Sequence, residues 1–133
     1  MTLTEAMPIL IADQDQRSRN RLRGVLEGEG FSTLPARTGG EAVELVRNRV
    51  VSITILDVLL PDLSGLETFE LITSVRGGVE GIFLAEERTK DTLVRLLEVG
   101  AFTVLQKPPR MDWLLDAVRR LAARIKNQSK ESN

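Results

Sequence analysis

Short apolar runs alternate along this chain with longer segments in which apolar residues recur every three or four positions. The runs are residues 9–12, 31–36, 51–56, 81–85 and 102–106. Their length and composition are typical of strands. Between them, positions such as Leu22, Val25 and Leu26 recur at the helical period. The pattern therefore predicts five consecutive strand–helix units.

Polar residues and glycine mark the ends of several predicted helices. Thr38 with Glu41, and Ser64 with Glu67, have the spacing of capping boxes at helix N-termini. Gly100 follows the fourth helical segment, where a glycine commonly ends a helix.

This succession predicts an α/β fold in which a parallel sheet is covered by helices on both faces. Right-handed crossovers make a doubly wound (βα)5 sandwich the simplest arrangement. Pro35 predicts that residues 31–36 form an edge strand, because proline cannot donate to a neighbouring strand. We expect one domain over residues 1–127, followed by a polar tail or the start of a linker at residues 128–133.

Three of the predicted strands are followed by residues that could act together. Asp13 follows the first run, Asp57 the third and Lys107 the fifth. Function in such sheets lies at the carboxyl ends of the strands, so these side chains are expected to converge. Gathered carboxylates need a cation, and Mg²⁺ prefers oxygen ligands. A carboxylate beside Mg²⁺ and a lysine can accept a phosphoryl group, which makes Asp57 the candidate phosphoacceptor.

Composition excludes several other kinds of chemistry. The chain has no Cys and no His, which excludes disulfides, thiol nucleophiles, Ser–His catalysis and the common zinc sites. Lys and Arg number 18 against 19 Asp and Glu, so no nucleic acid or membrane partner is expected from charge. No apolar run could span a bilayer, and residues 1–10 lack the basic region of a signal peptide. We therefore expect a cytoplasmic location.

Three segments carry a resemblance to a known family. They are ILIAD ending at Asp13, LDVLLPDLSG containing Asp57, and VLQKP containing Lys107. Pro61 and Gly65 stand four and eight residues after Asp57. In these features the chain, from about residue 8 to residue 127, resembles the receiver domain of two-component response regulators. The resemblance implies a flavodoxin-like three-layer sandwich with sheet order 2-1-3-4-5, and a cis peptide bond after Lys107.

The resemblance also implies partners and residue roles. A histidine kinase or phosphotransfer protein would deliver the phosphoryl group to Asp57 in a phosphorelay. The domain would not itself be an enzyme and would signal by protein–protein contact. Mg²⁺ would be held by Asp13, Asp57 and the backbone carbonyl of Leu59, with Gln14 as a weak ligand. Lys107 would contact the phosphoryl group.

Three positions depart from the family pattern. Gln14 replaces the second acid after the first strand, and a unit charge at about 4 Å is worth up to about 4 kcal/mol at an effective dielectric near 20. Ala85 lacks the hydroxyl that would hold a phosphoryl oxygen. Val104, three residues before Lys107, stands where the family carries an aromatic residue that couples to this hydroxyl and moves the face of the fourth helix. The alternative is therefore a pseudo-receiver that acts as an interaction module without phosphorylation. In that case Glu86 and Lys107 would form an ion pair.

Two further alternatives come from other functional classes. A flavodoxin-like FMN carrier needs a Ser/Thr-rich phosphate loop after the first strand, where this chain has Asp13, Gln14 and Asp15. A phosphatase-type hydrolase needs a second Asp two residues after the nucleophile, where Leu59 stands. Both are disfavoured.

The last helical segment carries a candidate partner face. Trp113, Ala117, Arg120 and Arg124 recur at helical spacing. The resemblance implies that the surface of the fourth and fifth helices docks a downstream protein or a second copy of the chain.

Charged residues after the first strand have an ordinary interpretation. Asp15 is expected to be a turn or N-cap residue, with a compensating role toward Mg²⁺ as the alternative. Arg17, Arg19, Arg21 and Arg23 alternate with other residues and so spread around a helix. We expect them to be solvated.

Overall fold

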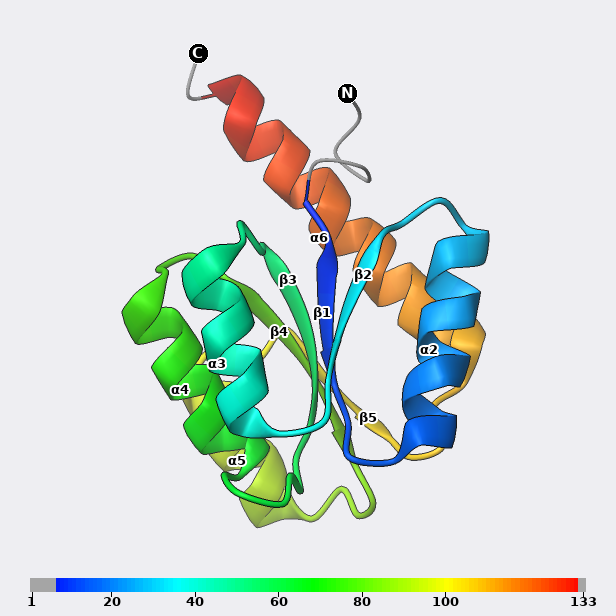
Figure 1. The fold of residues 1–133 in the computed structure, drawn as a ribbon, viewed down its shortest axis with the longest axis vertical. Coiled ribbons are helices and arrows are strands. Elements are labelled where there is room, and N and C mark those ends of the chain that lie inside the picture. The colour runs from blue at the N-terminus through cyan, green and yellow to red at the C-terminus, as the bar shows by residue number, and fades with distance from the viewer. Residues whose placement is uncertain (1–6, 132–133) are drawn as a thin grey trace.

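Strands and helices alternate throughout residues 7–131, the part of the chain that the computed structural model describes (Figure 1). The strands are β1 (Ile9–Ala12), β2 (Thr33–Ala36), β3 (Ile53–Asp57), β4 (Glu80–Ala85) and β5 (Thr103–Gln106). The helices are α2 (Gln16–Gly28), α3 (Gly39–Asn48), α4 (Gly65–Val75), α5 (Lys90–Glu98) and α6 (Met111–Glu131). The five predicted strand–helix units are confirmed.

All five strands pair in parallel, in the order β2-β1-β3-β4-β5. This is the order that the family resemblance implied. Pro35 lies in β2, which is an edge strand as predicted. Ala12 of β1 is in register with Leu56 of β3, so the residues that follow them emerge side by side. The register therefore brings Asp13 and Asp57 to the same edge of the sheet.

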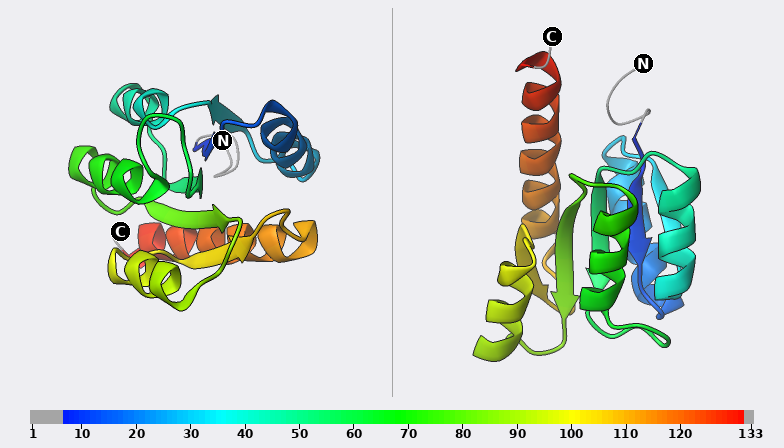
Figure 2. Two further views of the ribbon diagram at one scale, coloured as in Figure 1. Left: turned by 90° about the horizontal axis from the view of Figure 1, so that it is seen from below. Right: turned by 90° about the vertical axis from the view of Figure 1, so that its left-hand side faces the viewer.

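Two separate apolar layers hold the helices against the sheet. Alternate residues of a strand point to opposite faces, and β1 is buried on both. Leu10 and Ala12 pack with α3, α4 and α5 on one face, whereas Ile9 and Ile11 pack with α2 and α6 on the other. Figure 2 shows the resulting three layers end-on. Strands buried on both faces explain why the apolar runs in the sequence are nearly continuous.

The helix ends follow the predicted capping residues. The Ser64 box is complete, because the Ser64 hydroxyl accepts from the Glu67 N–H at 3.0 Å and the Glu67 carboxylate accepts from the Ser64 N–H at 3.2 Å. At the start of α3 the Thr38 hydroxyl accepts from the Glu41 N–H at 3.0 Å. The Glu41 carboxylate accepts from the Arg37 N–H and not from that of Thr38, so the predicted box is only half formed. Gly100 follows α5 with a φ of 93°, a left-handed conformation that glycine adopts without steric cost.

The last helix is longer than the sequence pattern indicated. It continues to Glu131, so residues 128–131, expected as a polar tail or linker, extend α6 beyond the sheet (Figures 1 and 2). Residues 132 and 133, and residues 1–6 on which the signal-peptide expectation partly rests, lie outside the described part. Within residues 7–131, no helix combines the length and apolar character needed to cross a membrane.

Candidate functional site

The candidate site lies where three strands end. Asp13 directly follows β1, Asp57 is the last residue of β3 and Lys107 directly follows β5. The Lys107 N–H donates to the Ala85 carbonyl at 2.8 Å, which fixes the lysine backbone beside β4. The peptide bond between Lys107 and Pro108 is cis, as expected. The sequence prediction that these three side chains converge agrees with this geometry.

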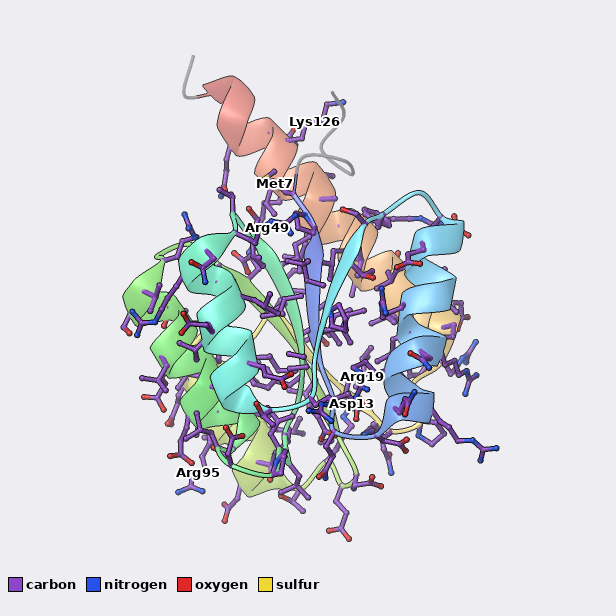
Figure 3. The ribbon with its side chains drawn as sticks, viewed as in Figure 1. Met7, Asp13, Arg19, Arg49, Arg95 and Lys126 are labelled. Carbon is purple, nitrogen blue, oxygen red and sulfur yellow. The ribbon has the colours of Figure 1, made fainter. Side chains whose placement is uncertain are left out.

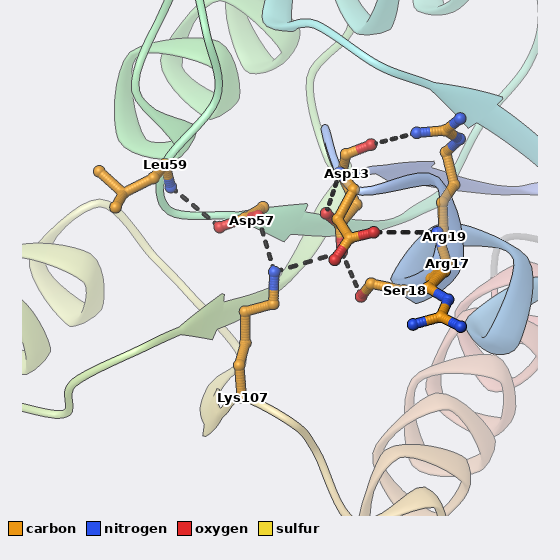
Figure 4. Close-up of polar contacts among 8 residues, drawn as sticks. Asp13, Arg17, Ser18, Arg19, Asp57, Leu59 and Lys107 are labelled. Carbon is orange, nitrogen blue, oxygen red and sulfur yellow. Dashed lines mark hydrogen bonds and ion pairs between the residues drawn. The ribbon is translucent and has the colours of Figure 1, made fainter.

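The Lys107 ammonium lies between the two carboxylates (Figure 4). Its Nζ atom is 2.9 Å from Oδ2 of Asp57 and 3.4 Å from Oδ2 of Asp13. Asp13 is fully buried and Asp57 is 4% exposed. The two carboxylates together carry one more charge than the Lys107 ammonium that lies between them, and all three groups are largely buried.

Burial and neighbouring charge set the proton affinities at this site. Burial raises the pKa of Asp57; the hydrogen bonds from Lys107 and from the Leu59 N–H oppose this rise without cancelling it, and the charge of Asp13 adds to it. Burial alone would lower the pKa of Lys107, but its hydrogen bond to Asp57 and the charges of Asp57 and Asp13 raise it. Lys107 is therefore held as a cation.

Asp13 is held by groups from the start of α2. Its Oδ1 atom accepts from the Asp15 N–H at 2.9 Å, and its Oδ2 atom accepts from the Ser18 hydroxyl at 2.5 Å. The Arg19 guanidinium donates to the Asp13 backbone carbonyl at 2.6 Å (Figures 3 and 4). Ser18 was not identified from the sequence, although it lies one helical turn after the N-cap residue Asp15.

The burial of Arg19 shows that one of the sequence predictions is wrong. The four arginines of α2 were expected to be solvated, but Arg19 is only 8% exposed. Its charge is turned inward to a carbonyl oxygen at the end of β1. The spacing of charged residues indicated that the arginines spread around the helix, but it did not indicate which of them faces the sheet.

The loop after β3 is folded tightly against Asp57. The Leu59 N–H donates to Oδ1 of Asp57 at 3.0 Å, and the Gly65 N–H donates to the Val58 carbonyl at 2.8 Å. A Cβ atom at Gly65 would overlap the Asp57 carbonyl oxygen and approach the Val58 Cα atom to 2.9 Å. This close approach is the physical reason for a glycine eight residues after Asp57.

The same loop is fastened to the neighbouring helix through Asp62. Its two carboxylate oxygens accept from the N–H groups of Gly39 and Gly40 at 2.8 and 2.9 Å. These are the first two residues of α3, whose N–H groups have no partner within the helix. The two hydrogen bonds, first that from Gly40 and then that from Gly39, hold the pKa of Asp62 below its usual value.

Asp13 and Asp57 are the residues that could hold a cation. Among the described residues, no three acidic or other metal-binding side chains are grouped together. Asp15 is the N-cap of α2 and accepts from the Arg17 N–H at 2.9 Å, so it fits the ordinary interpretation. The Gln14 side chain is exposed. Two buried carboxylates side by side fit a Mg²⁺ ion that keeps several of its water molecules.

A cleft of about 350 Å³ opens beside Asp57. It is lined by Val58, Leu59, Ala85, Glu86, Glu87 and Thr92. Ala85 lies at the end of β4 and is 3% exposed, and Val104 of β5 is also buried. The Glu86 side chain is exposed, and the Lys107 ammonium pairs with Asp57 and Asp13. The prediction that Glu86 and Lys107 form an ion pair is therefore wrong.

The candidate partner face on α6 is only partly exposed. Trp113 is 52% exposed, and the Arg110 guanidinium lies 4.6 Å from the centre of its ring. Ala117 is 6% exposed and packs in the core between α6 and the sheet. Ala117 therefore does not line an exposed face, contrary to the expectation.

The two arginines of that face make contacts within the chain. Arg120 pairs with Asp116 at 3.0 Å. Arg124 pairs with Glu80 of β4 at 2.6 Å and lies over the ring of Phe102. Arg124 thus fastens α6 to the sheet, and Trp113 is the member of the set with the most exposed apolar surface.

Comparison with known proteins places these features in one family. The family model of the response regulator receiver domain matches residues 9–119. The response regulator MprA of Mycobacterium sp. (strain KMS) is 33% identical over 116 residues, which are 87% of this chain and 50% of that protein. The transcriptional regulatory protein ZraR of Klebsiella oxytoca is 29% identical over 110 residues, which are 83% of this chain and 25% of that protein.

Solved structures agree with the sequence comparisons. A CheY-like response regulator receiver domain protein from Methanospirillum hungatei JF-1 is similar with a TM-score of 0.86 and 26% identity, over 92% of this chain and 98% of that one. The chain spans about half the length of the MprA relatives that it matches.

Proposed function

This chain belongs to the family of response regulator receiver domains of two-component signalling, and on that premise we propose that Asp57 is its phosphoacceptor. The observation that carries the proposal is the Lys107 ammonium, which lies 2.9 Å from the Asp57 carboxylate. A buried carboxylate with a fixed cation beside it is suited to accept a phosphoryl group, because the cation neutralises charge on the transferring oxygens.

The chemical step is the transfer of a phosphoryl group to a carboxylate oxygen of Asp57. A bond forms between that oxygen and phosphorus, and the bond from phosphorus to the donor's leaving atom breaks. The electron pair of the broken bond stays with the donor, which is the phosphorylated histidine of a kinase or phosphotransfer protein. Lys107, whose pKa is raised by Asp57 and Asp13 against the opposing effect of burial, stays charged throughout.

Receiver domains generally use Mg²⁺ in this reaction, and the residues present fit that ion. Asp13 and Asp57 would hold it, with the backbone carbonyl of Leu59 and a weak contribution from the Gln14 amide oxygen. When bound, the ion supplies positive charge to the transferring oxygens. Because Gln14 carries no charge, we propose that this chain binds Mg²⁺ more weakly than a receiver with an acid at that position.

Ala85 alters how the phosphoryl group would be held. It occupies the end of β4, beside the cleft that opens next to Asp57. Its methyl group cannot donate a hydrogen bond to a phosphoryl oxygen. A hydrogen bond to a charged group contributes roughly 1.5–3 kcal/mol, and this chain lacks that contribution at β4. We therefore propose that Lys107 holds the phosphoryl group without help from β4, and that phosphorylation is slow.

The readout of this domain is proposed to be contact with another protein. A second cleft of about 350 Å³ beside the site is lined in part by Arg88, Gln106, Lys107, Arg110 and Trp113. Tryptophan and arginine contribute strongly to protein interfaces. The charges beside the ring are already paired, because Arg110 lies 2.7 Å from Asp112 and Lys107 lies 2.9 Å from Asp57. We propose that a downstream protein docks around Trp113. A second copy of the chain is the alternative, which sedimentation of the phosphorylated protein distinguishes.

The proposal is tested by the intact mass of the chain after incubation with Mg²⁺ and acetyl phosphate. We expect the mass of one added phosphoryl group in the wild-type chain and no addition in Asp57→Asn. Circular dichroism shows whether each sample is folded. A folded wild-type chain that gains no mass would contradict the proposal and favour a receiver that works without phosphorylation.

A further inference from the structure

Asp13 already has several hydrogen-bond donors from the chain itself. Its Oδ2 atom accepts from the Ser18 hydroxyl at 2.5 Å and from the Lys107 ammonium at 3.4 Å. Its Oδ1 atom accepts from the Asp15 N–H at 2.9 Å. A carboxylate oxygen offers about two acceptor positions. Both positions of Oδ2 are therefore used within the chain.

The hydrogen bond between Ser18 and Asp13 is short, and the positions of both residues are held by neighbouring contacts. A distance of 2.5 Å is in the range of charge-assisted O–H to carboxylate bonds, which are roughly twice as strong as neutral ones. Ser18 lies in the first turn of α2, and that turn begins at the N-cap Asp15. Arg19, the next residue, is buried and bonds the backbone carbonyl of Asp13 at 2.6 Å. Figure 4 shows Ser18 and Arg19 on the same side of Asp13.

We propose that Ser18 is a positioning residue that lowers the affinity of the site for divalent cations. Oδ2 is the oxygen of Asp13 that faces Asp57 across the Lys107 ammonium. A Mg²⁺ ion shared by the two carboxylates would therefore approach Oδ2, where it competes with the Ser18 hydroxyl and with the Lys107 ammonium. The hydroxyl thus stabilises Asp13 in the cation-free protein and competes with the metal. This effect adds to the missing charge at Gln14. It rests on the proposed cation site and is independent of whether Asp57 is phosphorylated.

Calorimetric titration of the whole chain with MgCl₂, without a phosphodonor, tests the inference. We expect Ser18→Ala to bind Mg²⁺ about three- to tenfold more tightly than the wild type, since tenfold corresponds to about 1.4 kcal/mol. Ser18→Thr keeps the hydroxyl and should return the affinity to the wild-type value. Ser74→Ala removes an exposed helix hydroxyl that donates to the Leu71 carbonyl, far from the site in the sequence, so it should leave the affinity unchanged. Asp13→Asn should weaken binding in either background.

Each result bears on the inference. Equal affinity in Ser18→Ala and wild type, or no Mg²⁺ binding by Ser18→Ala, would overturn it. Weaker binding by Ser18→Ala would overturn it too, because the hydroxyl would then help to hold the ion. Ser18→Cys provides a second variant of similar size with a weaker donor, and its affinity should lie between those of the wild type and Ser18→Ala. Thermal unfolding followed by circular dichroism without Mg²⁺ verifies that each variant is folded. The mass measurement on Asp57 is separate, so either proposal can fail without the other.

Discussion

The Lys107 ammonium and the Asp57 carboxylate are 2.9 Å apart, although 50 residues separate them in the chain. The same ammonium lies 3.4 Å from the carboxylate of Asp13, which stands 94 positions earlier in the chain. The ends of three strands are therefore joined by one side chain. The charge balance of the site depends on that side chain.

We expect Lys107→Ala to destabilise the chain by about 3 kcal/mol at neutral pH. The variant leaves Asp13 and Asp57 facing each other, and breaking a buried ion pair costs about 3–5 kcal/mol. The lower end applies because the Lys107 side chain keeps 12% exposure. The pKa of Lys107 is raised above 10.5, so its stabilisation is complete below pH 10.5 and is lost as the pH rises through the folded-state pKa. Urea unfolding measures the difference, and the exposed Lys90→Ala serves as control. An equal loss in both variants would contradict the expectation.

Asp57→Asn is expected to stabilise the folded chain at neutral pH. Burial raises the pKa of Asp57 above 3.8 despite Lys107, so the wild type loses stability as the pH rises from 3.8 through the folded-state pKa. A neutral amide avoids this loss, and Lys107 keeps the Asp13 carboxylate as an ion partner at 3.4 Å. We expect a gain on the order of 1 kcal/mol, the scale of a typical single substitution, that disappears in acid. Urea unfolding at several pH values measures it. A variant less stable than the wild type at pH 7 would disprove this account.

The chemistry at the strand ends was predictable because it follows directly from the apolar runs. Once a run is identified as a strand, the residue after it is known to stand at the edge of the sheet, as Asp13 and Lys107 do. The roles of Asp57 as phosphoacceptor and of Asp13 as a metal ligand stay predictions.

Contacts that depend on helix orientation and loop path could not be predicted in this way. Ser18 and Arg19 stand four and three residues before Leu22, on the apolar face of α2, but a reading by polarity alone assigns polar residues to the solvent face. Ala117 follows Trp113 by one helical turn, but this spacing does not show where the exposed face of the helix ends and the buried face begins. The hydrogen bonds from the start of α3 to Asp62 depend on the path of the loop after β3. A loop has no periodic pattern of apolar residues from which that path could be predicted.

Asp62→Ala should lower the unfolding midpoint at neutral pH. The variant removes the acceptors for the N–H groups of Gly39 and Gly40, and it also removes a negative charge from a helix N-terminus. Because the pKa of Asp62 is lowered from 3.8, its stabilisation is present above pH 3.8 and is lost as the pH falls through the folded-state pKa. Thermal unfolding against pH tests this. Asp62→Asn has only one acceptor oxygen and should give a smaller decrease, whereas the exposed Glu70→Ala should give little change at any pH.

Ala85→Thr is expected to increase the rate of phosphorylation by acetyl phosphate about tenfold. The added hydroxyl lies beside the Asp57 cleft, and a hydrogen bond to a charged group is worth roughly 1.5–3 kcal/mol. The rate is read from the time course of the intact mass. Ala85→Val adds similar bulk without a hydroxyl and should not accelerate the reaction. If both variants behave alike, the missing hydroxyl is not what limits the rate.

Gln14→Asp should tighten Mg²⁺ binding at least tenfold. It adds a charge next to Asp13, and a unit charge at about 4 Å contributes up to about 4 kcal/mol at an effective dielectric near 20. Calorimetry measures the affinity. Gln16→Asp introduces the same charge at the exposed first residue of α2, and a comparable gain there would show that the effect is not local to the site.

The edge position of Pro35 has a consequence for how this protein behaves at high concentration. An edge strand with unpaired backbone groups is a template onto which another chain can add a strand, which leads to aggregation. β2 has four residues, and its proline lacks the N–H that such an added strand would need. The opposite edge strand, β5, is also four residues long. Both borders of the sheet are therefore poor starting points for intermolecular β-pairing, which favours a protein that stays dispersed while its apolar interior remains covered by helices.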